Sequence, residues 1–252
     1  MDCSVMGGQA AGPGRDAFAV AAASAADAPA KASLCMTCSV RDRCIGGVAA
    51  EAGTRELLAV LAGRRLVRAG EVVQQPGSFL RVVRSGSFKS IATGAAGTAH
   101  PCGLHFPGEV ISGGRPLQLV ALEDSELCVM RCGVDGRPGL ESRTCLGRLW
   151  DMVSRELLRE RAQASRLAAL HPVRRITAFL ASLAVRARVR GASPRGLRLH
   201  LSEADIAGFL GVPPETVGRV LEVLAKREVL LPGPRNLVIV NPELLQRAAG
   251  SD

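Results

Sequence analysis

Apolar residues between positions 66 and 130 form short runs that glycine and proline interrupt every few residues. Leu80–Val83 and Leu117–Leu122 are two of these runs. Short runs bounded by Gly and Pro turns predict β-strands, and a series of them favours a small antiparallel barrel or roll. Just before this region, Leu57–Leu61 shows a helical pattern, so we expect a helix that ends at the basic pair Arg64-Arg65.

Between residues 141 and 170 the pattern changes to one long helix, whose seam positions alternate in spacings of four and three. This spacing predicts a coiled-coil seam of about three heptads, and therefore pairing with a second copy of the chain. The alternative is an amphipathic helix packed against its own domain, but the surrounding arginines leave only a narrow apolar stripe. A carboxylate in a symmetric seam meets its own copy, so we expect Glu160 to weaken the dimer. The predicted seam comprises Leu146, Trp150, Val153, Leu157, Glu160, Ala164 and Leu167.

The C-terminal region carries the signals of a helix-turn-helix. Ser202 can cap a helix from Glu203 to Leu210, with Asp205 as the acidic partner of a capping box. Gly211 suits the left-handed turn that ends this helix. A second helix is expected to begin at Pro213-Pro214, because proline fits a first turn whose amides lack partners. Its expected buried stripe contains Val217, Val220, Leu221 and Leu224.

Glu215, Gly218 and Arg219 share the opposite face of the second helix, which a DNA major groove could receive. Arg219 can donate two hydrogen bonds to guanine O6 and N7, and Glu215 can accept one from a cytosine amino group. Gly218 costs roughly 1 kcal/mol of helix stability relative to Ala, which is tolerable if the helix must approach DNA closely. Two short strands within residues 229–240 would make a winged variant. The alternative is an ordinary helical hairpin with a surface Glu–Arg pair.

Composition and charge agree with a DNA-binding protein. The formal net charge is +9, and residues 174–198 hold seven arginines and no acid. Such an excess suggests a polyanionic partner, either nucleic acid or an acidic membrane surface, although a solvated basic surface is the alternative. No apolar run approaches the roughly 18–20 residues of a membrane span, and the N-terminus lacks a secretory signal. We therefore expect a soluble cytoplasmic protein, and residues 1–31 read as a disordered tail.

Three of the eight cysteines, Cys35, Cys38 and Cys44, lie within ten residues of one another. In a reducing cytosol such thiols are metal ligands or buried side chains rather than disulfides, and their polar segment offers no core to bury them. Iron–sulfur clusters take four thiolates and zinc accepts the same set, so spacing leaves the metal open. Cys102, in a Pro-Cys-Gly turn, and Cys128, just after an apparent strand, are close competitors for the fourth position.

These motifs together resemble the fumarate–nitrate reduction regulator (Fnr) branch of the cyclic-AMP receptor/Fnr superfamily, from about Leu34 to Leu245. In this family the fourth cluster ligand follows an Ala-Leu-Glu-x-Ser stretch. That stretch begins here at Ala121, so the resemblance selects Cys128. The resemblance rests on the spacing of Cys35, Cys38 and Cys44 and on the segments Gly70-Glu71-Val72, Arg84-Ser85-Gly86, His105-Phe106-Pro107-Gly108-Glu109 and Glu215-Thr216-Val217-Gly218-Arg219.

The resemblance implies a [4Fe–4S] cluster that forms when oxygen is absent and favours dimerisation through the long helix. The dimer would bind palindromic double-stranded DNA, contact RNA polymerase and act mainly as an activator, without catalytic activity. Oxygen would degrade the cluster, and nitric oxide could attack it. One alternative is the same DNA-binding fold with a zinc or dithiol redox-switch site. Less favoured is an iron–sulfur electron-transfer protein, against which the helix-turn-helix stands.

The recognition helix departs from the family pattern at one position. Fnr-type helices usually read Glu-x-x-Ser-Arg, whereas this chain has Gly218 in place of Ser. That pattern is similar to the cyclic-AMP receptor branch, which however has an Arg where Pro214 stands here. The shared Glu215 and Arg219 imply a G–A core in each DNA half-site.

The cyclic-nucleotide pocket of the superfamily is also incomplete. In the superfamily this pocket is similar in each member to a Gly-Glu-Leu segment that is followed shortly by Arg-Ser or Arg-Thr. In this chain the nearby arginine after Gly108-Glu109 is Arg115, and Pro116 follows it. We therefore expect no cyclic nucleotide as effector.

The expected fold is α+β, with five segments. They are the tail (1–31), a cluster-binding cysteine segment (32–50), a β-roll of the cyclic-nucleotide-binding, double-stranded β-helix type (51–140), a dimerisation helix (141–170) and a winged helix-turn-helix (171–247).

Overall fold

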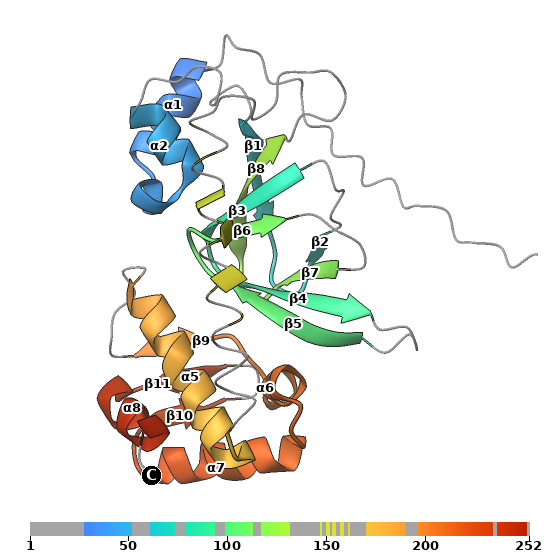
Figure 1. Cartoon of the computed structure of the whole chain (residues 1–252), viewed down its shortest axis with the longest axis vertical. Helices are drawn as coiled ribbons and strands as arrows, with labels where there is room; N and C mark the ends of the chain where they lie inside the picture. The colour runs from blue at the N-terminus through green and yellow to red at the C-terminus, as the bar shows by residue number, and fades with distance from the viewer. Residues whose placement is uncertain are drawn as a thin grey trace, which may run out of the picture.

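The structure is a computed structural model that describes residues 28–51, 61–73, 79–93, 99–112, 117–131, 170–189, 196–233 and 236–250, with single positions between 147 and 161. Antiparallel strands form its N-terminal half, and helices with a small sheet form its C-terminal half (Figure 1). The predicted α+β architecture is confirmed. Among the described residues, no helix has the length and apolar character needed to cross a membrane.

Two four-stranded antiparallel sheets make up the N-terminal roll, in the orders β1-β8-β3-β6 and β2-β7-β4-β5. Buried side chains from both sheets, including Val83, Phe88, Leu119 and Leu127, pack in one cluster between them. Burial of these apolar faces holds the sheets together. The strands are β1 (Leu61–Val67), β2 (Val72–Val73), β3 (Phe79–Ser85), β4 (Phe88–Thr93), β5 (Ala99–His105), β6 (Val110–Ser112), β7 (Leu117–Ala121) and β8 (Ser125–Arg131).

Two local predictions within the roll are wrong. Leu61 and Arg64-Arg65 belong to β1, which pairs with β8, and not to the end of a helix. Cys102 lies inside β5 and not in a turn. A run of a few apolar residues does not separate helix from strand, and here pairing with a neighbouring strand decides.

The cysteine segment is helical and has a core, in contrast to the polar loop that the sequence predicts. It comprises α1 (Ala28–Met36), a short 3₁₀ helix (Arg41–Arg43) and α2 (Ile45–Glu51). Val40, Cys44 and Ile45 are buried against Leu80, Val82 and Met130, so the segment packs on the outer face of the β1-β8-β3-β6 sheet (Figure 1). Helix α1 begins at Ala28, within the segment expected to be a disordered tail; residues 1–27 lie outside the described residues.

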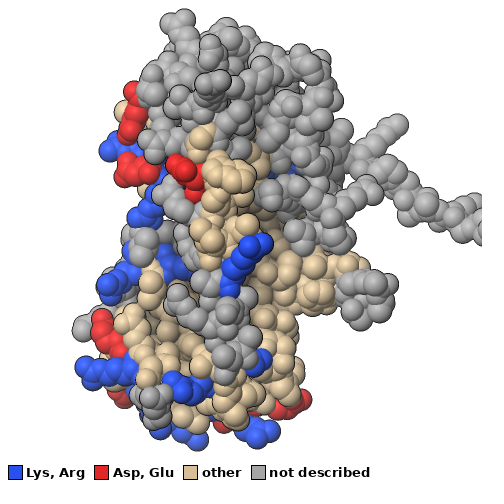
Figure 2. Space-filling model, viewed as in Figure 1, with Lys and Arg blue, Asp and Glu red and all other residues tan. Residues whose placement is uncertain are grey.

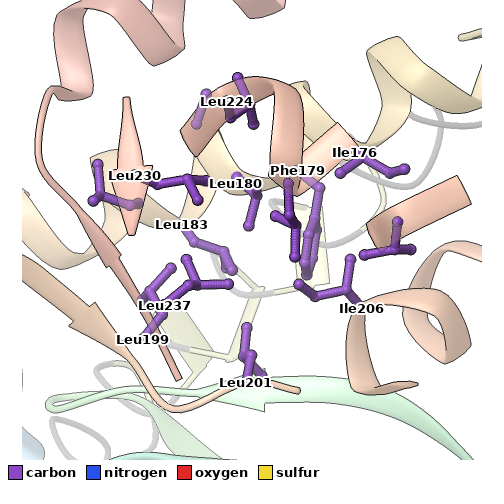
Figure 3. Packing of buried hydrophobic residues seen from close by; sticks show 14 of the residues in the cluster. Ile176, Phe179, Leu180, Leu183, Leu199, Leu201, Ile206, Leu224, Leu230 and Leu237 are labelled. Carbon is purple, nitrogen blue, oxygen red and sulfur yellow. The ribbon is translucent and has the colours of Figure 1, made fainter. Parts of the chain in front are cut away.

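The C-terminal domain has the predicted helix-turn-helix with a small sheet (β10-β11-β9) beside it. Strand β9 is an addition to the two strands that the sequence indicates. Leu180, Leu183, Ile206 and Leu230 point into one apolar core between the helices and this sheet (Figure 3). Its elements are α5 (Pro172–Val189), β9 (Leu197–Leu199), α6 (Glu203–Leu210), α7 (Pro214–Lys226), β10 (Leu230–Pro232), β11 (Leu237–Ile239) and α8 (Pro242–Gly250).

The local signals of the helix-turn-helix operate as predicted. The Ser202 side chain accepts a hydrogen bond from the Asp205 backbone, and the Asp205 carboxylate accepts one from the Ser202 backbone, which completes the capping box. Gly211 ends α6 with φ 60° and ψ 40°, in the left-handed region that glycine adopts most easily. The predicted stripe of α7, Val217, Val220, Leu221 and Leu224, is buried.

Part of the predicted dimerisation helix is described. Trp150, Val153 and Leu157 are helical and exposed, with Trp150 74% exposed. At these three positions the helix presents apolar side chains to solvent. The other predicted seam positions, Leu146, Glu160, Ala164 and Leu167, lie outside the described residues.

Candidate cysteine centre and DNA-binding helix

Four thiols from two distant parts of the chain line one cavity of about 180 Å³. Three of them, Cys35, Cys38 and Cys44, come from the helical cysteine segment, and Cys128 comes from β8. Cys102 is exposed on β5 of the other sheet and does not line this cavity. The structure thus separates the two residues that the spacing left as competitors.

The alternation of side chains along β8 places Cys128 on the face that the cysteine segment covers. In β8 the side chain of Leu127 is buried between the two sheets, whereas Cys128 and Met130 face the outer side, against the cysteine segment. Cys128 is opposite Arg64 of β1 and Val82 of β3, so its backbone sits at the centre of a rigid sheet. It lies within the strand, and not just after it as predicted.

The start of α2 lies against two of the thiols. A side chain on Gly46 would begin 3.1 Å from Cys35 Sγ and 3.7 Å from Cys44 Sγ, so only a glycine leaves this space to the two sulfurs. The backbone N–H groups of Gly46 and Gly47 donate hydrogen bonds to the Cys44 thiol, which partly offset the rise in its pKa that burial causes. The chain thus shapes the cavity with backbone as well as with side chains.

Burial makes three of these thiols, those of Cys35, Cys44 and Cys128, hard to ionise. Desolvation, with the nearby thiols adding to it, raises the pKa of Cys35 to about 11 and that of Cys128 to about 12. Desolvation also raises the pKa of Cys44, against the backbone hydrogen bonds. The three thiols are therefore protonated at neutral pH, and a metal centre must displace their protons to bind.

Two arginines and one glutamate supply charge beside the thiols. Arg64 and Arg84 line the cavity, and Arg84 donates a hydrogen bond to the Cys38 thiol. Glu126 forms ion pairs with Arg84 and, at 3.2 Å, with Arg64. Because a strand has a period of two, Glu126 shares the outer face of β8 with Cys128. The sequence motifs did not assign these three residues to the thiol site. The spacing of two between Glu126 and Cys128 is the signal in the sequence that could have placed Glu126 beside it.

The thiols do not converge on a single point. Among the described parts of the chain, no three His, Cys, Asp or Glu side chains are arranged as a ligand set for one metal ion. The four thiols nevertheless interact electrostatically, since Cys35, Cys38 and Cys44 all raise the pKa of Cys128. They surround a space instead of meeting at one atom.

The residues predicted to read DNA lie at the start of α7. Glu215 and Arg219 are exposed and one helical turn apart, on the face opposite the buried stripe. Gly218 also faces the first turn of α6. A side chain added to it would begin 3.3 Å from the Glu203 carboxylate. The glycine therefore leaves room for the Glu203 carboxylate beside α7.

Replacing Gly218 by alanine is expected to stabilise the domain by up to about 1 kcal/mol, because alanine is the better helix former. The Glu203 carboxylate, at 3.3 Å, is the end of a flexible side chain and can move aside. Denaturant unfolding of both proteins measures the gain. The matched control is Gly208→Ala in α6, where the new methyl group would lie 2.7 Å from the Pro101 ring and must displace it. Equal stabilisation by the two substitutions would contradict this account.

The arginines between 174 and 198 are not all available to a polyanion. Arg175 donates hydrogen bonds to the carbonyl oxygens of Leu170 and Leu210, and Arg186 forms an ion pair with Glu109. Lys and Arg side chains on the face shown in Figure 2 are accompanied by acidic ones. Part of the positive excess that the sequence predicts for this region therefore holds the protein together.

A winged helix-turn-helix with exposed polar side chains on its second helix, joined to an antiparallel β-roll, defines a DNA-binding regulator. Residues 174–248 match the family of the Crp-like helix-turn-helix domain. The chain is 26% identical over 225 residues to the fumarate and nitrate reduction regulatory protein of Vibrio cholerae, covering 86% of this chain and 90% of that protein. The same protein of Escherichia coli K12 is 26% identical over 230 residues, with the same coverage.

Solved structures agree on the fold. FixK2 from Bradyrhizobium japonicum superimposes with a TM-score of 0.59 at 22% identity, over 75% of this chain and 98% of that one. As the sequence motifs predict, the chain is similar to the Crp/Fnr group of transcription regulators: its C-terminal part matches the Crp-like helix-turn-helix family, and its curated relatives include proteins of the Fnr branch. These relatives are regulators and not enzymes, in agreement with the prediction of a protein without catalytic activity.

Proposed function

We propose that this transcription regulator holds a [4Fe–4S] cluster on Cys35, Cys38, Cys44 and Cys128 and uses it to respond to oxygen. The observation that carries the proposal is the single cavity that these four thiols line, although Cys128 is far from the others in sequence. Four thiolates are the ligand set of such a cluster. A cluster occupies a volume and not a point, which suits thiols that surround a space.

The charges around the cavity suit an anionic occupant. A cluster with four thiolates is negative overall, and Arg64 and Arg84 place two cations beside it. Glu126 holds both arginines, so their positions do not depend on the occupant. Neighbours of this kind orient metal ligands and tune their basicity. When bound, the cluster would be the oxygen-sensitive group of the regulator, because oxygen can degrade it.

The output of the regulator is DNA binding by a homodimer. The exposed apolar side chains of Trp150, Val153 and Leu157 suit a helix–helix interface. Glu215 and Arg219 would read a palindromic site, and the bound dimer would contact RNA polymerase to activate transcription in the cytoplasm. Cyclic AMP is not the effector that we propose, because the Glu109 carboxylate is already bound by Arg186.

Anaerobic purification tests the proposal directly. The protein is expected to be brown, to carry about four irons per chain, and to lose colour, dimer and DNA affinity together when air is admitted. Iron and sulfide analysis, sedimentation and DNA-binding titration follow the three changes. Colourless protein with one zinc and air-insensitive DNA binding would replace the cluster with a zinc site. Iron-free protein whose DNA affinity follows thiol oxidation would favour a dithiol switch instead.

A further inference from the structure

The turn between β5 and β6 lies between the cysteine segment and the DNA-binding domain. This link turn, residues 106–109, faces the cysteine segment on one side and contacts α5 on the other. A change in the conformation of the cysteine segment could therefore be transmitted through this turn to the C-terminal domain of the same chain. The contacts on each side are specific.

On the side of the cysteine segment, the link turn faces Val40 and Arg43 at Gly108. Its φ of +85° is in the left-handed region, and its backbone N–H donates a 2.8 Å hydrogen bond to the carbonyl of Val83 in β3. A side chain on Gly108 would begin 3.6 Å from Cβ of Arg43 and 3.8 Å from Cβ of Val40. Both residues lie between Cys38 and Cys44. A rearrangement of the thiols at either end of that stretch is therefore expected to shift the groups that face the link turn.

On the side of the DNA-binding domain the contact is made by Arg186 of α5. Its Nη2 donates hydrogen bonds to Glu109 Oε1 at 2.8 Å and to the carbonyl of Leu104 at 2.9 Å. Its guanidinium group lies 5.0 Å from the centre of the Phe106 ring. The other carboxylate oxygen, Glu109 Oε2, accepts a 2.8 Å hydrogen bond from the Phe106 backbone and so closes the turn.

This contact is buried and continuous with a core. The side chains of Arg186 and Glu109 are 13% and 2% exposed, and Leu104 and Phe106 of the roll belong to the same apolar cluster as Phe179 and Leu201 of the C-terminal domain. Removal of one member of a buried ion pair is costly, because the other charge is left without its partner. The domain is therefore held in one orientation by an interaction that has few equivalent alternatives.

We infer that the link turn couples the cysteine segment to the DNA-binding domain within each chain, with Arg186 as the positioning residue that transmits the state of the cysteine site. This inference rests on the proposed function, because it presupposes that the cluster changes the cysteine segment. It adds a route that does not pass through the dimer interface. Loss of the Arg186–Glu109 pair should leave cluster binding and dimerisation intact and reduce only the effect of the cluster on DNA affinity.

The chain offers a matched control. Lys89 of β4 forms an ion pair with Asp205 of α6, which also joins the roll to the DNA-binding domain. Lys89 lies in the other sheet, which does not carry Cys128, so this pair connects the same two parts of the chain by a different route. Lys89→Gln removes an interdomain ion pair without touching the link turn.

The test compares Arg186→Gln, Glu109→Gln and Lys89→Gln with the unaltered chain. For each protein, iron per chain, the monomer–dimer equilibrium and the DNA affinity per dimer are measured with and without the cluster. Arg186→Gln and Glu109→Gln are expected to keep their iron and dimer equilibrium but to lower the ratio of the two DNA affinities by about tenfold. Lys89→Gln should keep the ratio of the unaltered chain.

Each outcome has a distinct meaning. An unchanged affinity ratio in Arg186→Gln, or an equal fall in Lys89→Gln, overturns the coupling. If Arg186→Gln loses its fold, judged by circular dichroism, Glu109→Gln decides alone, because Gln keeps the shape of the side chain and can still accept a hydrogen bond from the Phe106 backbone. An unaltered chain that takes up no iron contradicts the proposed function instead, and that result is seen before any variant is compared.

Discussion

Cys128→Ser is expected to abolish cluster binding, with iron falling from about four per chain to below one. The cysteine segment would retain three thiols, but the sheet that forms the opposite wall of the cavity would no longer offer a thiolate. A serine hydroxyl is a far weaker ligand for iron than a thiolate, because soft metal centres prefer sulfur. Iron and sulfide analysis with visible absorption after anaerobic reconstitution measures the effect.

The control for this substitution is Cys102→Ser. Cys102 lies in the same roll and on a strand, but it is exposed and outside the cavity. Cys102→Ser should bind iron as the unaltered chain does. Loss of iron in Cys102→Ser together with retention in Cys128→Ser would show that the cavity is not the cluster site.

Arg219→Gln is expected to weaken binding to the palindromic site by about 1–3 kcal/mol for each half-site, and to relax base preference at the guanine. Arg219 is exposed on the first turns of α7, opposite its buried stripe, so its loss removes a contact without disturbing the core. Titration of the dimer with specific and scrambled DNA measures both effects. The difference between the two affinities should shrink, since a base contact carries sequence information and a phosphate contact does not.

Arg227→Gln provides the comparison at the other end of the same helix. Arg227 is exposed and follows the last turn of α7, so its replacement removes the same charge where the recognition face has ended. Its effect on the specific and the scrambled site should be small and similar. An equal loss of specificity in the two variants would mean that Arg219 acts through charge alone.

The DNA-binding half of the molecule could be predicted because its signals are local. The capping box of Ser202 and Asp205, the left-handed Gly211 and the prolines before α7 each determine the backbone within one turn of themselves. The stripe from Val217 to Leu224 repeats with the period of a helix, so its burial also followed from spacing. Strand β9 could not be predicted in this way, because it gains its partner only from β11.

The cysteine half shows the limit of local reasoning. Leu61, the last residue of the predicted helical run before Arg64, is part of β1, because pairing with β8 satisfies the backbone there. The sequence predicts the cysteine segment as a loop without a core. It is instead helical and packs its apolar side chains against the outer face of a sheet whose strands lie further along the chain. Spacing could group three thiols, but before the structure only the family resemblance favoured Cys128 over Cys102, and the cavity now separates them.

By itself the sequence predicted the grouping of three thiols, the class of fold and the two helices of the helix-turn-helix, because each depends on residues close together in the chain. The tertiary structure decided which distant groups meet: Cys128 joins the three thiols, Arg84 and Glu126 supply the charges beside them, and Arg186 reaches Glu109. The physical reason is that strand register and the packing of the two domains bring these residues together. Contacts of that kind leave no periodic trace in the sequence.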